Sequence, residues 1–509
     1  MKKILNIFFL FSFFCFGQNT IILTDDDIKG FPGAVAHGEN AMKNSGGTIN
    51  VRFVTNCNDT GAGSFRQALL DAVSSSTQDY IIFRTACSEI QYDADFYIGP
   101  QSGSGGNIYV AGQTAPGGGI AIRHLNSTAN RNLYLRGSDI IVRHIRFRGG
   151  DGPNTDAIKV GDNNMDYAMG DIIIDHCSFS HGEDEVISIT TKLGNTYTDA
   201  AASITNVTFS NNLIGGGLGP RYAMLAYGEN IFNLSVVRNL FTNNRERHML
   251  SNGIENETEF INNIVYNFIS AYVGTVRQKL SVIGNIFDEG NLAGASNFTV
   301  RLNDCSTQNC PPSGDSNYTG TQTYYDDNTD NSTGNGAADY DPDMITYLQP
   351  SRVVASSYNP ESTAVLENLI LNDVGAGAGT SQGLDSFDQG QLDDYNNKTG
   401  SYETSWSGVT LSSGTAYTDT DSDGLSDDYE LAQGGTATSI VNSDRPATAV
   451  IANGDTVDQS GVTNFATEGF NHIKIFLSDL AGDWNKFPAN PISVTVQGRK
   501  STNAVLTSM

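Results

Sequence analysis

Short runs of β-branched residues, separated by polar turns, recur through the middle of the chain. The clearest are IIVRHIRFRGGD (140–151), IIIDHCSFSHGEDEVISI (172–189), VTFSNNLIGG (207–216), SVVRNLFTNN (235–244) and EFINNIVYNF (259–268). They recur at irregular spacings of roughly 20 to 35 residues, and no amphipathic helical pattern lies between them. The Asn-Gly and Asp-Gly pairs that the hairpins of a propeller or sandwich would require are scarce between the runs. The pattern therefore predicts the coils of a parallel β-solenoid.

An asparagine precedes two apolar residues in four successive runs, at Asn212, Asn239, Asn263 and Asn285. An asparagine at the same place in successive coils is typical of an inward ladder, in which each side-chain amide bonds to the backbone at a turn. A solenoid of this kind presents a long groove, which suits a polymeric ligand.

The N-terminus predicts the compartment. Residues 1–17 (MKKILNIFFLFSFFCFG) combine a charged start at Lys2 and Lys3 with an apolar stretch too short for a confident membrane span, and a small residue follows. This is typical of a secretory signal peptide, so we expect a secreted, periplasmic or cell-surface protein. No other segment is apolar enough to span a bilayer.

Five cysteines remain after the predicted signal peptide. In an oxidising compartment, Cys57 with Cys87 and Cys305 with Cys310 are plausible disulfides. Cys177 lies inside a β-branched run, where we expect a buried packing thiol.

The motifs divide the chain into a long solenoid with an appendage. Residues 18–86 are expected to form an N-terminal cap and the first coils, because Ser64 is a credible N-cap for a helix over 65–73 that would cover the open end of the stack. Coils should continue over 87–303, followed by an acidic low-complexity loop over 304–345. Residues 346–417 are assigned to the C-terminal part of the same domain, and residues 418–509 to a distinct tail.

The net charge of −27 constrains the partners. It argues against nucleic acid, which requires a basic face. It also disfavours an anionic polysaccharide, unless the acidic residues hold metal ions that bridge to that substrate.

The tail contains the sharpest local motif, DTDSDGLSDDYE (419–430). Its oxygen-bearing residues occupy positions 1, 3, 5, 9 and 12 of an EF-hand-type calcium loop, with glycine at position 6 and a backbone carbonyl at position 7. The expected ligands are Asp419, Asp421, Asp423, Leu425, Asp427 and Glu430. An acidic linker is the alternative interpretation. If calcium binds, its role should be structural, because protein ligands saturate the loop.

A second acidic set lies in the coils, at Asp156, Asp184 and Glu185. Equivalent places in neighbouring coils lie about 4.8 Å apart. Carboxylates this close repel unless a cation lies between them, and calcium takes oxygen ligands while leaving valences for substrate. Two coils further on, Arg245 and Arg247 form a basic island; the alternative is that they are solvated charges paired with Glu246 and Asp184.

These residues carry a family resemblance. FPGAVAHGEN (31–40) and VRFVTNCNDTGAGSFRQAL (51–69) resemble the mature N-terminus of secreted bacterial pectate lyases of polysaccharide lyase family 1. The run over 172–189 resembles their central DHCSFS segment, and NRERHML (244–250) with the run over 259–268 resembles their arginine-containing strand and the turn that follows. The similarity covers most of 31–287. The calcium loop and GVTNFATEGFNHIKIFLSDL (461–480) resemble the C-terminal part of many such enzymes.

The resemblance implies an all-β protein, a right-handed single-stranded parallel β-helix with an N-terminal helical cap and a C-terminal calcium-loop extension. It implies cleavage of polygalacturonate by β-elimination, in which the C5 proton beside a uronate carboxylate is removed and the C4 glycosidic oxygen is expelled. Ca²⁺ bridging protein and uronate would acidify that proton and neutralise the intermediate. Metal ions would thus make an acidic groove a receptor for a polyanion.

Carried over residue by residue, the resemblance implies that Asp156 and Asp184 bind calcium and that Arg247 is the base. Asn154 falls where the family often has another aspartate, and Ser188 where it often has a third acidic ligand; Glu185 would compensate. A guanidinium is an unusual base, so the metal and neighbouring cations would have to help Arg247 lose a proton.

The substrate-binding residues depart further from the family. Leu250 stands where a second substrate-binding arginine is common, and Tyr222 lies near a position often occupied by lysine. Arg221 or Arg245 could replace those residues, and His248 completes the expected substrate-binding set.

Two rival functions remain open. A β-helix glycoside hydrolase such as a polygalacturonase would use paired carboxylates like Asp184 and Glu185. A noncatalytic polysaccharide-binding or adhesin solenoid would use calcium for structure only. Unsaturated products, detected by their ultraviolet absorbance, would distinguish a lyase from both. We expect a monomer.

Overall fold

The computed structural model describes residues 19–487, apart from residues 44–47, 74, 76, 101–104, 126–131, 151, 153, 193–201, 254, 276, 292–298, 304–319 and 332–344. The predicted signal peptide and the Cys305–Cys310 pair therefore lie outside the described residues, as do most of the acidic loop and the last 22 residues of the tail. Among the described helices, none is long and apolar enough to cross a membrane.

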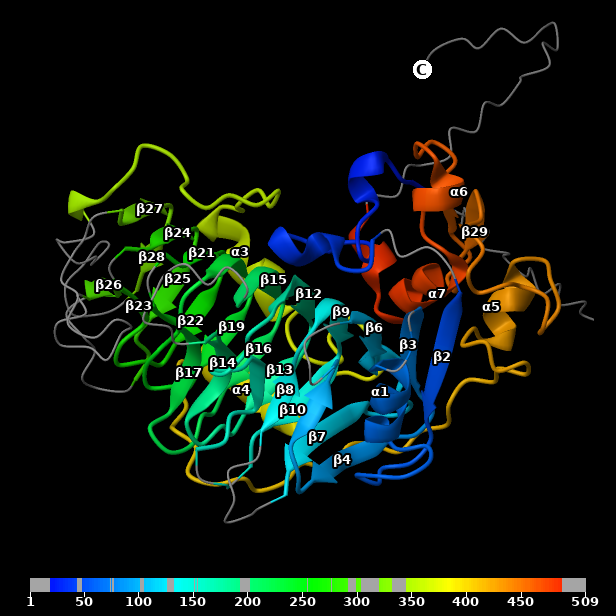
Figure 1. Cartoon of the computed structure of the whole chain (residues 1–509), viewed down its shortest axis with the longest axis horizontal. Coiled ribbons are helices and arrows are strands. Elements are labelled where there is room, and N and C mark those ends of the chain that lie inside the picture. Colours follow the sequence, from blue (N-terminus) through cyan, green and yellow to red (C-terminus); the bar gives the residue numbers. More distant parts are fainter. Residues whose placement is uncertain are drawn as a thin grey trace, which may run out of the picture.

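Three long parallel sheets form the body of the molecule, and successive strands of the chain visit the three sheets in turn. The predicted solenoid is thereby confirmed: the chain is a right-handed single-stranded parallel β-helix, whose coils stack along the long axis of the molecule (Figure 1). The first sheet, of ten strands, comprises β2 (Ile49–Val54), β3 (Gln78–Phe83), β6 (Gly106–Ala111), β9 (Ser138–Arg143), β12 (Ala168–Asp175), β15 (Ser203–Ser210), β18 (Ile231–Val237), β21 (Glu257–Ile261), β24 (Lys279–Ile283) and β27 (Gln322–Asp326).

The other two long sheets complete each coil. The nine-stranded sheet comprises β4 (Cys87–Tyr92), β7 (Ile120–His124), β10 (Ile145–Arg148), β13 (Ser178–Ser180), β16 (Leu213–Gly215), β19 (Leu240–Thr242), β22 (Ile264–Tyr266), β25 (Ile286–Asp288) and β28 (Thr329–Asp330). The eight-stranded sheet comprises β5 (Phe96–Ile98), β8 (Leu133–Leu135), β11 (Ile158–Gly161), β14 (Glu185–Thr190), β17 (Tyr222–Tyr227), β20 (Leu250–Asn252), β23 (Tyr272–Thr275) and β26 (Val300–Asn303).

Strands of the ten-stranded sheet read as continuous apolar runs because both of their faces are covered. In β9, Ile140 and Val142 belong to the interior core of the coil, whereas Ile141 between them packs into a second apolar cluster outside it. Successive side chains of a strand point to opposite faces, so one run supplies both clusters.

The asparagine ladder is confirmed. The amide of Asn212 donates to the Ile174 carbonyl and to the side chain of Asn239, and the same pattern continues through Asn263 and Asn285. The structure adds a further rung that the sequence analysis missed, because Asn285 donates to Asn328 at 2.8 Å. The ladder satisfies buried amides at one corner of the five coils from Asn212 to Asn328 and fixes their register.

The predicted helix is also confirmed. Helix α1 (Phe65–Val73) begins after Ser64, whose hydroxyl accepts from the Gln67 amide, and its apolar side packs onto the first coils. Cys57 and Cys87 form the expected disulfide, and Cys177 is a free, buried thiol.

The two ends of the described chain meet on the outer face of the ten-stranded sheet. β1 (Thr20–Ile22) pairs in parallel with β30 (Thr456–Asp458), which also pairs with β29 (Thr448–Val450). The C-terminal extension contributes α5 (Asp427–Ala432), α6 (Phe465–Glu468) and α7 (His472–Leu480), which lie beside the N-terminal segment in Figure 1. The short 3-10 turns are η1 (Asp25–Asp27), η2 (His37–Asn40), η3 (Gly112–Thr114) and η4 (Asp483–Lys486).

Two further helices cover the nine-stranded sheet. Helix α3 (Thr363–Leu371) and α4 (Ser386–Asn397) pack Leu366, Ile370 and Leu392 against outward-facing residues of that sheet such as Leu240. The extensions thus pack against two of the three long sheets, and the third carries the acidic residues identified above.

Candidate active site

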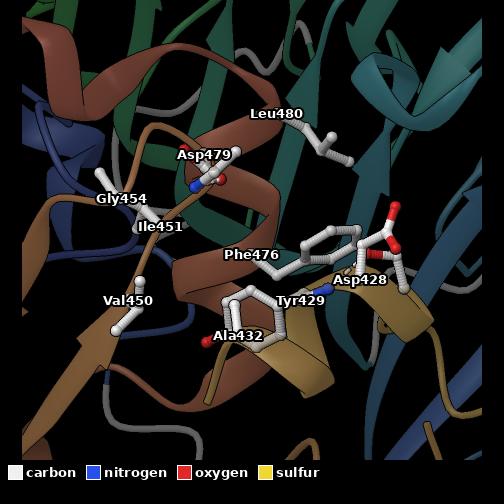
Figure 2. Close-up of a pocket in the computed structure, with 11 residues that line it drawn as sticks. Asp428, Tyr429, Ala432, Val450, Ile451, Gly454, Phe476, Asp479 and Leu480 are labelled. Atoms are coloured by element: carbon white, nitrogen blue, oxygen red, sulfur yellow. Dashed lines mark hydrogen bonds between the residues drawn. The ribbon is translucent and has the colours of Figure 1, made fainter. Parts of the chain in front are cut away.

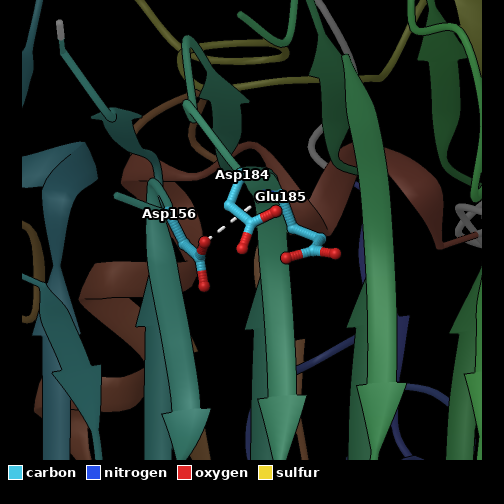
Figure 3. A group of neighbouring side chains, drawn as sticks. All are labelled: Asp156, Asp184 and Glu185. Atoms are coloured by element: carbon cyan, nitrogen blue, oxygen red, sulfur yellow. Dashed lines mark hydrogen bonds between the residues drawn. The ribbon is translucent and has the colours of Figure 1, made fainter. Parts of the chain in front are cut away.

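Three carboxylates meet at the beginning of two neighbouring strands of the eight-stranded sheet. Asp156 lies just before β11, Asp184 just before β14, and Glu185 is the first residue of β14. Figure 3 shows their side chains side by side, and each offers an oxygen within 4.8 Å of the others. We call Asp156, Asp184 and Glu185 the acidic trio. The structure brings together the three residues that the sequence analysis grouped.

The trio is held by the coil stacking itself. The Glu185 amide donates to Asp156 Oδ1 at 3.3 Å, and the Asp184 amide donates to the Thr155 carbonyl. Asp156 and Glu185 are buried, whereas Asp184 is half-buried. Burial raises the pKa of Asp156, and burial together with the charge of Asp156 raises the pKa of Glu185 to about 8. Carboxylates so placed are costly unless a cation joins them.

The trio fits a hard cation. Three carboxylates are the oxygen donors that calcium prefers, and Asp156 Oδ2 accepts no hydrogen bond from the described residues although it is buried. Asp156, Asp184 and Glu185 would hold the ion.

Two cations flank the trio. Lys159 Nζ lies 3.3 Å from Asp156 Oδ2, and Arg247 Nη1 pairs with Glu185 Oε1. The guanidinium of Arg247 also stacks on the ring of Tyr222, 3.6 Å from its centre. Arg247 is therefore positioned by an aromatic face and a carboxylate, and its side chain remains 27% exposed.

Arg245 occupies a different environment. Its side chain is 43% exposed and pairs with Glu246 at 3.2 Å, as the alternative interpretation expected. Neither Arg245 nor Arg247 belongs to a strand, and Arg247 has φ +63°, so the alternation of a β-strand does not set the directions of their side chains. Their shared segment is a turn between β19 and β20, in which only Glu246 forms a bridge, to Tyr222.

Arg221 also lies in a turn, with φ +66° and its guanidinium over the ring of Tyr402 at 5.2 Å. Its carbonyl accepts the Arg245 amide at 2.8 Å, so the backbones of the two arginines are joined. Asn154 is exposed, two residues before Asp156, with φ +54°.

The expectation that His248 contacts substrate is corrected by the structure. His248 is fully buried between Phe241 and Phe268, its Nδ1 lies 3.1 Å from the Ser270 carbonyl, and burial lowers its pKa to about 4. It packs in the interior and does not face the groove.

Sequence reasoning missed two residues of this site. In the sequence, Lys159 resembles an ordinary surface charge in an alternating strand. Tyr222 was noted only because it lies near a position where the family often has a lysine, and its contact with Arg247 was not predicted. The signal for Lys159 was its place three residues after Asp156, on the outward side of the same strand.

The C-terminal loop holds a second acidic cluster. Asp419, Asp421 and Asp423 offer oxygens within 4.8 Å of one another. Asp419 accepts the amides of Asp423 and Gly424, and Asp423 accepts the amide of Leu425. Burial raises the pKa of Asp423 to about 6. Gly424 has φ +94°, the sharp turn that position 6 of a calcium loop requires.

The other expected loop ligands lie outside the group of three, although Glu430 Oε2 is buried and accepts no hydrogen bond from the described residues. Asp427 accepts the Thr420 amide and hydroxyl, both at 2.8 Å, and Glu430 accepts the Ile440 amide at 3.0 Å. Leu425 is buried in the apolar cluster outside the ten-stranded sheet. A cavity of about 430 Å³ lies nearby, lined by Tyr429 on α5 and Phe476 on α7 (Figure 2). All of its lining residues belong to the extension, so it is separate from the trio.

Comparison with known proteins identifies the family. The chain is 30% identical over 424 residues to "Probable pectate lyase C" of Aspergillus flavus, with 79% of this chain and 87% of that protein covered. The protein of the same name from Aspergillus terreus is 31% identical over 280 residues, covering 53% of this chain and 56% of its own length. The chain belongs to the pectate lyase family. It is a polysaccharide lyase.

These relatives are fungal, whereas the sequence resemblance was drawn to bacterial enzymes. No family model matches the chain. Among solved structures, the cedar pollen allergen jun a 1 aligns with a TM-score of 0.47 and 17% identity, over 67% of this chain and 92% of that one. A pectate lyase from Bacillus sp. N165, in complex with trigalacturonate, aligns with a TM-score of 0.40 and 14% identity, over 68% of this chain and 99% of that one.

Proposed function

We propose that this pectate lyase cleaves polygalacturonate by calcium-assisted β-elimination and releases 4,5-unsaturated oligogalacturonides. The observation that carries the proposal is the acidic trio with Arg247 paired to Glu185 at its edge. Metal ligands and a base must lie together for this reaction, because the proton to be removed is on the carbon next to the uronate carboxylate.

Bound calcium would act as a Lewis acid on the uronate carboxylate, which makes the C5 proton more acidic. The chain's own residues supply the rest. Arg247, held between the Tyr222 ring and Glu185, takes the C5 proton after its guanidinium has lost one of its own protons to solvent. The half-exposed side chain of Arg245 binds a uronate carboxylate. Arg221 lies beside Arg245 and extends the same cationic surface. Asn154, exposed and two residues before Asp156, is assigned to the same metal site as a further oxygen ligand.

The charges at the site support a metal-bridged polyanion. When all three carboxylates are ionised, as calcium binding requires, the trio and its two flanking cations, Lys159 and Arg247, carry one net negative charge. A divalent cation changes this to one positive charge, which a single uronate carboxylate balances. A site of this composition repels a uronate without the metal and attracts one with it.

The C-terminal loop, Asp419 to Glu430, is proposed as a separate structural calcium site. Its cluster is tied to the β-helix by Arg84, which pairs with Asp419 at 3.0 Å and donates to the Tyr417 carbonyl. We further propose that residues 1–17 direct export and that the enzyme acts outside the cytoplasm.

The test is the ultraviolet absorbance of unsaturated products from polygalacturonate, with calcium and with excess chelator. Chelation should abolish the absorbance change while circular dichroism shows that the coils remain folded. Full activity in excess chelator would sink the calcium mechanism. Chain cleavage without the absorbance would indicate hydrolysis in place of elimination.

A further inference from the structure

Lys159 occupies an unusual position for a surface lysine. It faces outward from β11, between the buried side chains of Ile158 and Val160, and its cross-strand neighbours are Tyr134 on β8 and Ser188 on β14. Its ammonium turns back onto Asp156, with Nζ 3.3 Å from Oδ2, and its side chain is 23% exposed. One end of the trio is therefore covered by a lysine that can still reach solvent.

Asp156 explains why a cation is needed there. The residue is fully buried, and its Oδ2 accepts no hydrogen bond from the described part of the chain. An ionised carboxylate in such a place is strongly destabilising unless a charge partner lies close. Lys159 supplies that partner at Asp156, and Arg247 supplies it at Glu185.

A divalent cation on the same carboxylates would compete with Lys159. The ammonium of Lys159 and a divalent cation bound to the same carboxylate would repel each other at this short distance. The lysine has a flexible four-carbon stem, so its ammonium can leave Asp156 without movement of the strand. Because the side chain is already partly exposed, the direction open to it is outward, into the groove where the polymer would lie.

We infer that Lys159 is an exchangeable counter-cation: it neutralises Asp156 in the metal-free protein and moves to a substrate carboxylate when a metal ion takes its place. The inference rests on the proposed function and adds to it a residue that links metal binding to uronate binding. Lys159 then has two opposite effects. It weakens the binding of the metal when no substrate is present, and it strengthens the binding of the polyanion.

The test is Lys159→Met, which keeps the length of the side chain and removes its charge. Calcium affinity without substrate, measured by calorimetry, should become about tenfold tighter, because solvent already screens part of the repulsion from a side chain that is 23% exposed. KM for polygalacturonate should rise by about tenfold with kcat changed far less, the signature of lost binding. Asp184→Asn identifies which calorimetric step belongs to the trio, because the C-terminal loop would bind calcium separately.

Two further variants serve as controls. Lys159→Arg keeps the charge and should retain both the weaker metal affinity and the lower KM of the wild-type protein. Lys279→Met removes a similar lysine ion pair, with Glu257 at 2.6 Å on the ten-stranded sheet, and should change neither quantity.

Metal affinity that is unchanged or weaker in Lys159→Met would overturn the inference, as would a KM equal to that of the wild type. Absence of unsaturated products from the wild-type enzyme would contradict the proposed function instead. The calcium titration needs no turnover, so it would still decide whether Lys159 and the metal compete.

Discussion

The two acidic clusters of this protein have similar ligands but are assembled in different ways. The trio comes from two coils, and side-chain cations neutralise it. The loop cluster comes from alternate residues, Asp419 to Asp423, and its own backbone amides donate to it. The shape of the trio is thus set by the stacking of the coils, whereas the shape of the loop cluster is set by the turns of its own backbone.

The two clusters also differ in what packs around them. Leu425 and Tyr429, within and just after the loop, pack into the apolar cluster that joins the extension to the ten-stranded sheet. An ion there would hold one part of the fold against another. The trio lies on the eight-stranded sheet, and the extensions pack against the other two sheets. This position suits a reaction on a polymer.

The largest effect is expected from Arg247→Lys, which changes the arginine that pairs with Glu185 of the trio. If Arg247 removes the C5 proton, turnover should fall at least about a hundredfold, within the range that loss of a general base costs. Lysine keeps the positive charge, but its ammonium cannot lie on the Tyr222 ring and pair with Glu185 at the same time, as the guanidinium of Arg247 does. Initial rates of unsaturated product formation measure the loss.

Arg245→Lys is the matched control for that experiment. Arg245 is more exposed and pairs with the neighbouring Glu246, so its replacement should raise KM more than it lowers kcat. An inactive Arg245→Lys beside an active Arg247→Lys would show that the base had been assigned to the wrong arginine.

The second prediction separates the clusters by their effect on stability. Asp423→Ala should remove about 2–3 kcal/mol of calcium-linked stability when calcium is about a hundredfold above the loop's Kd, while turnover per folded molecule stays near the wild-type value. Asp184→Asn should instead abolish turnover, and in excess chelator its thermal midpoint should stay near that of the wild type, because the coil stacking holds the trio without a metal. Thermal melts with and without calcium, paired with rate measurements, provide the check. Loss of turnover in Asp423→Ala at unchanged stability would contradict a structural role for the loop.

The smallest effect concerns protons. Glu185, with a pKa of about 8, is mostly protonated at pH 7, whereas Asp423, with a pKa of about 6, is mostly ionised. Because calcium binds the carboxylate, uptake at the trio should release up to one proton at pH 7 and uptake at the loop very little. Trio affinity should therefore rise with pH until about 8. Calorimetry in two buffers of different ionisation enthalpy counts the protons, and Glu185→Gln should abolish the release.

The same pKa has a stability consequence in the metal-free enzyme. The folded-state pKa of Glu185 lies above its ordinary value of 4.5, so the unfolded chain loses this proton first as pH rises. Glu185 therefore destabilises the metal-free fold progressively from about pH 4.5 to about pH 8. Calcium at the trio should remove that dependence.

The features predicted correctly from sequence are those that repeat or are local. The ladder from Asn212 to Asn285 was visible because each coil repeats the same requirement, and α1 because Ser64 caps it locally. Asn328 was missed because the low-complexity stretch before it interrupts the repeat. The helices over 363–397 were missed because their packing on the nine-stranded sheet, rather than their own periodicity, determines them.

The site was predicted in part for the same reason. Spacing within coils placed Asp156, Asp184 and Glu185 together, because parallel register brings equivalent positions side by side. It failed at Arg245 to His248, where a left-handed residue in a turn breaks the alternation and sends His248 inward. No periodic pattern reports such a local reversal of the backbone.

The pairing of β1 with β30 has a consequence for the order in which the protein matures. Asn19 donates to Asp455, 436 residues later, so the first strand waits for its partner until almost the whole described chain has emerged. Until then the outer apolar face of the early coils, including Tyr80, Tyr109 and Ile141, is uncovered. β30 therefore joins the two ends of the described chain, because it pairs with β1 on one side and with β29 on the other.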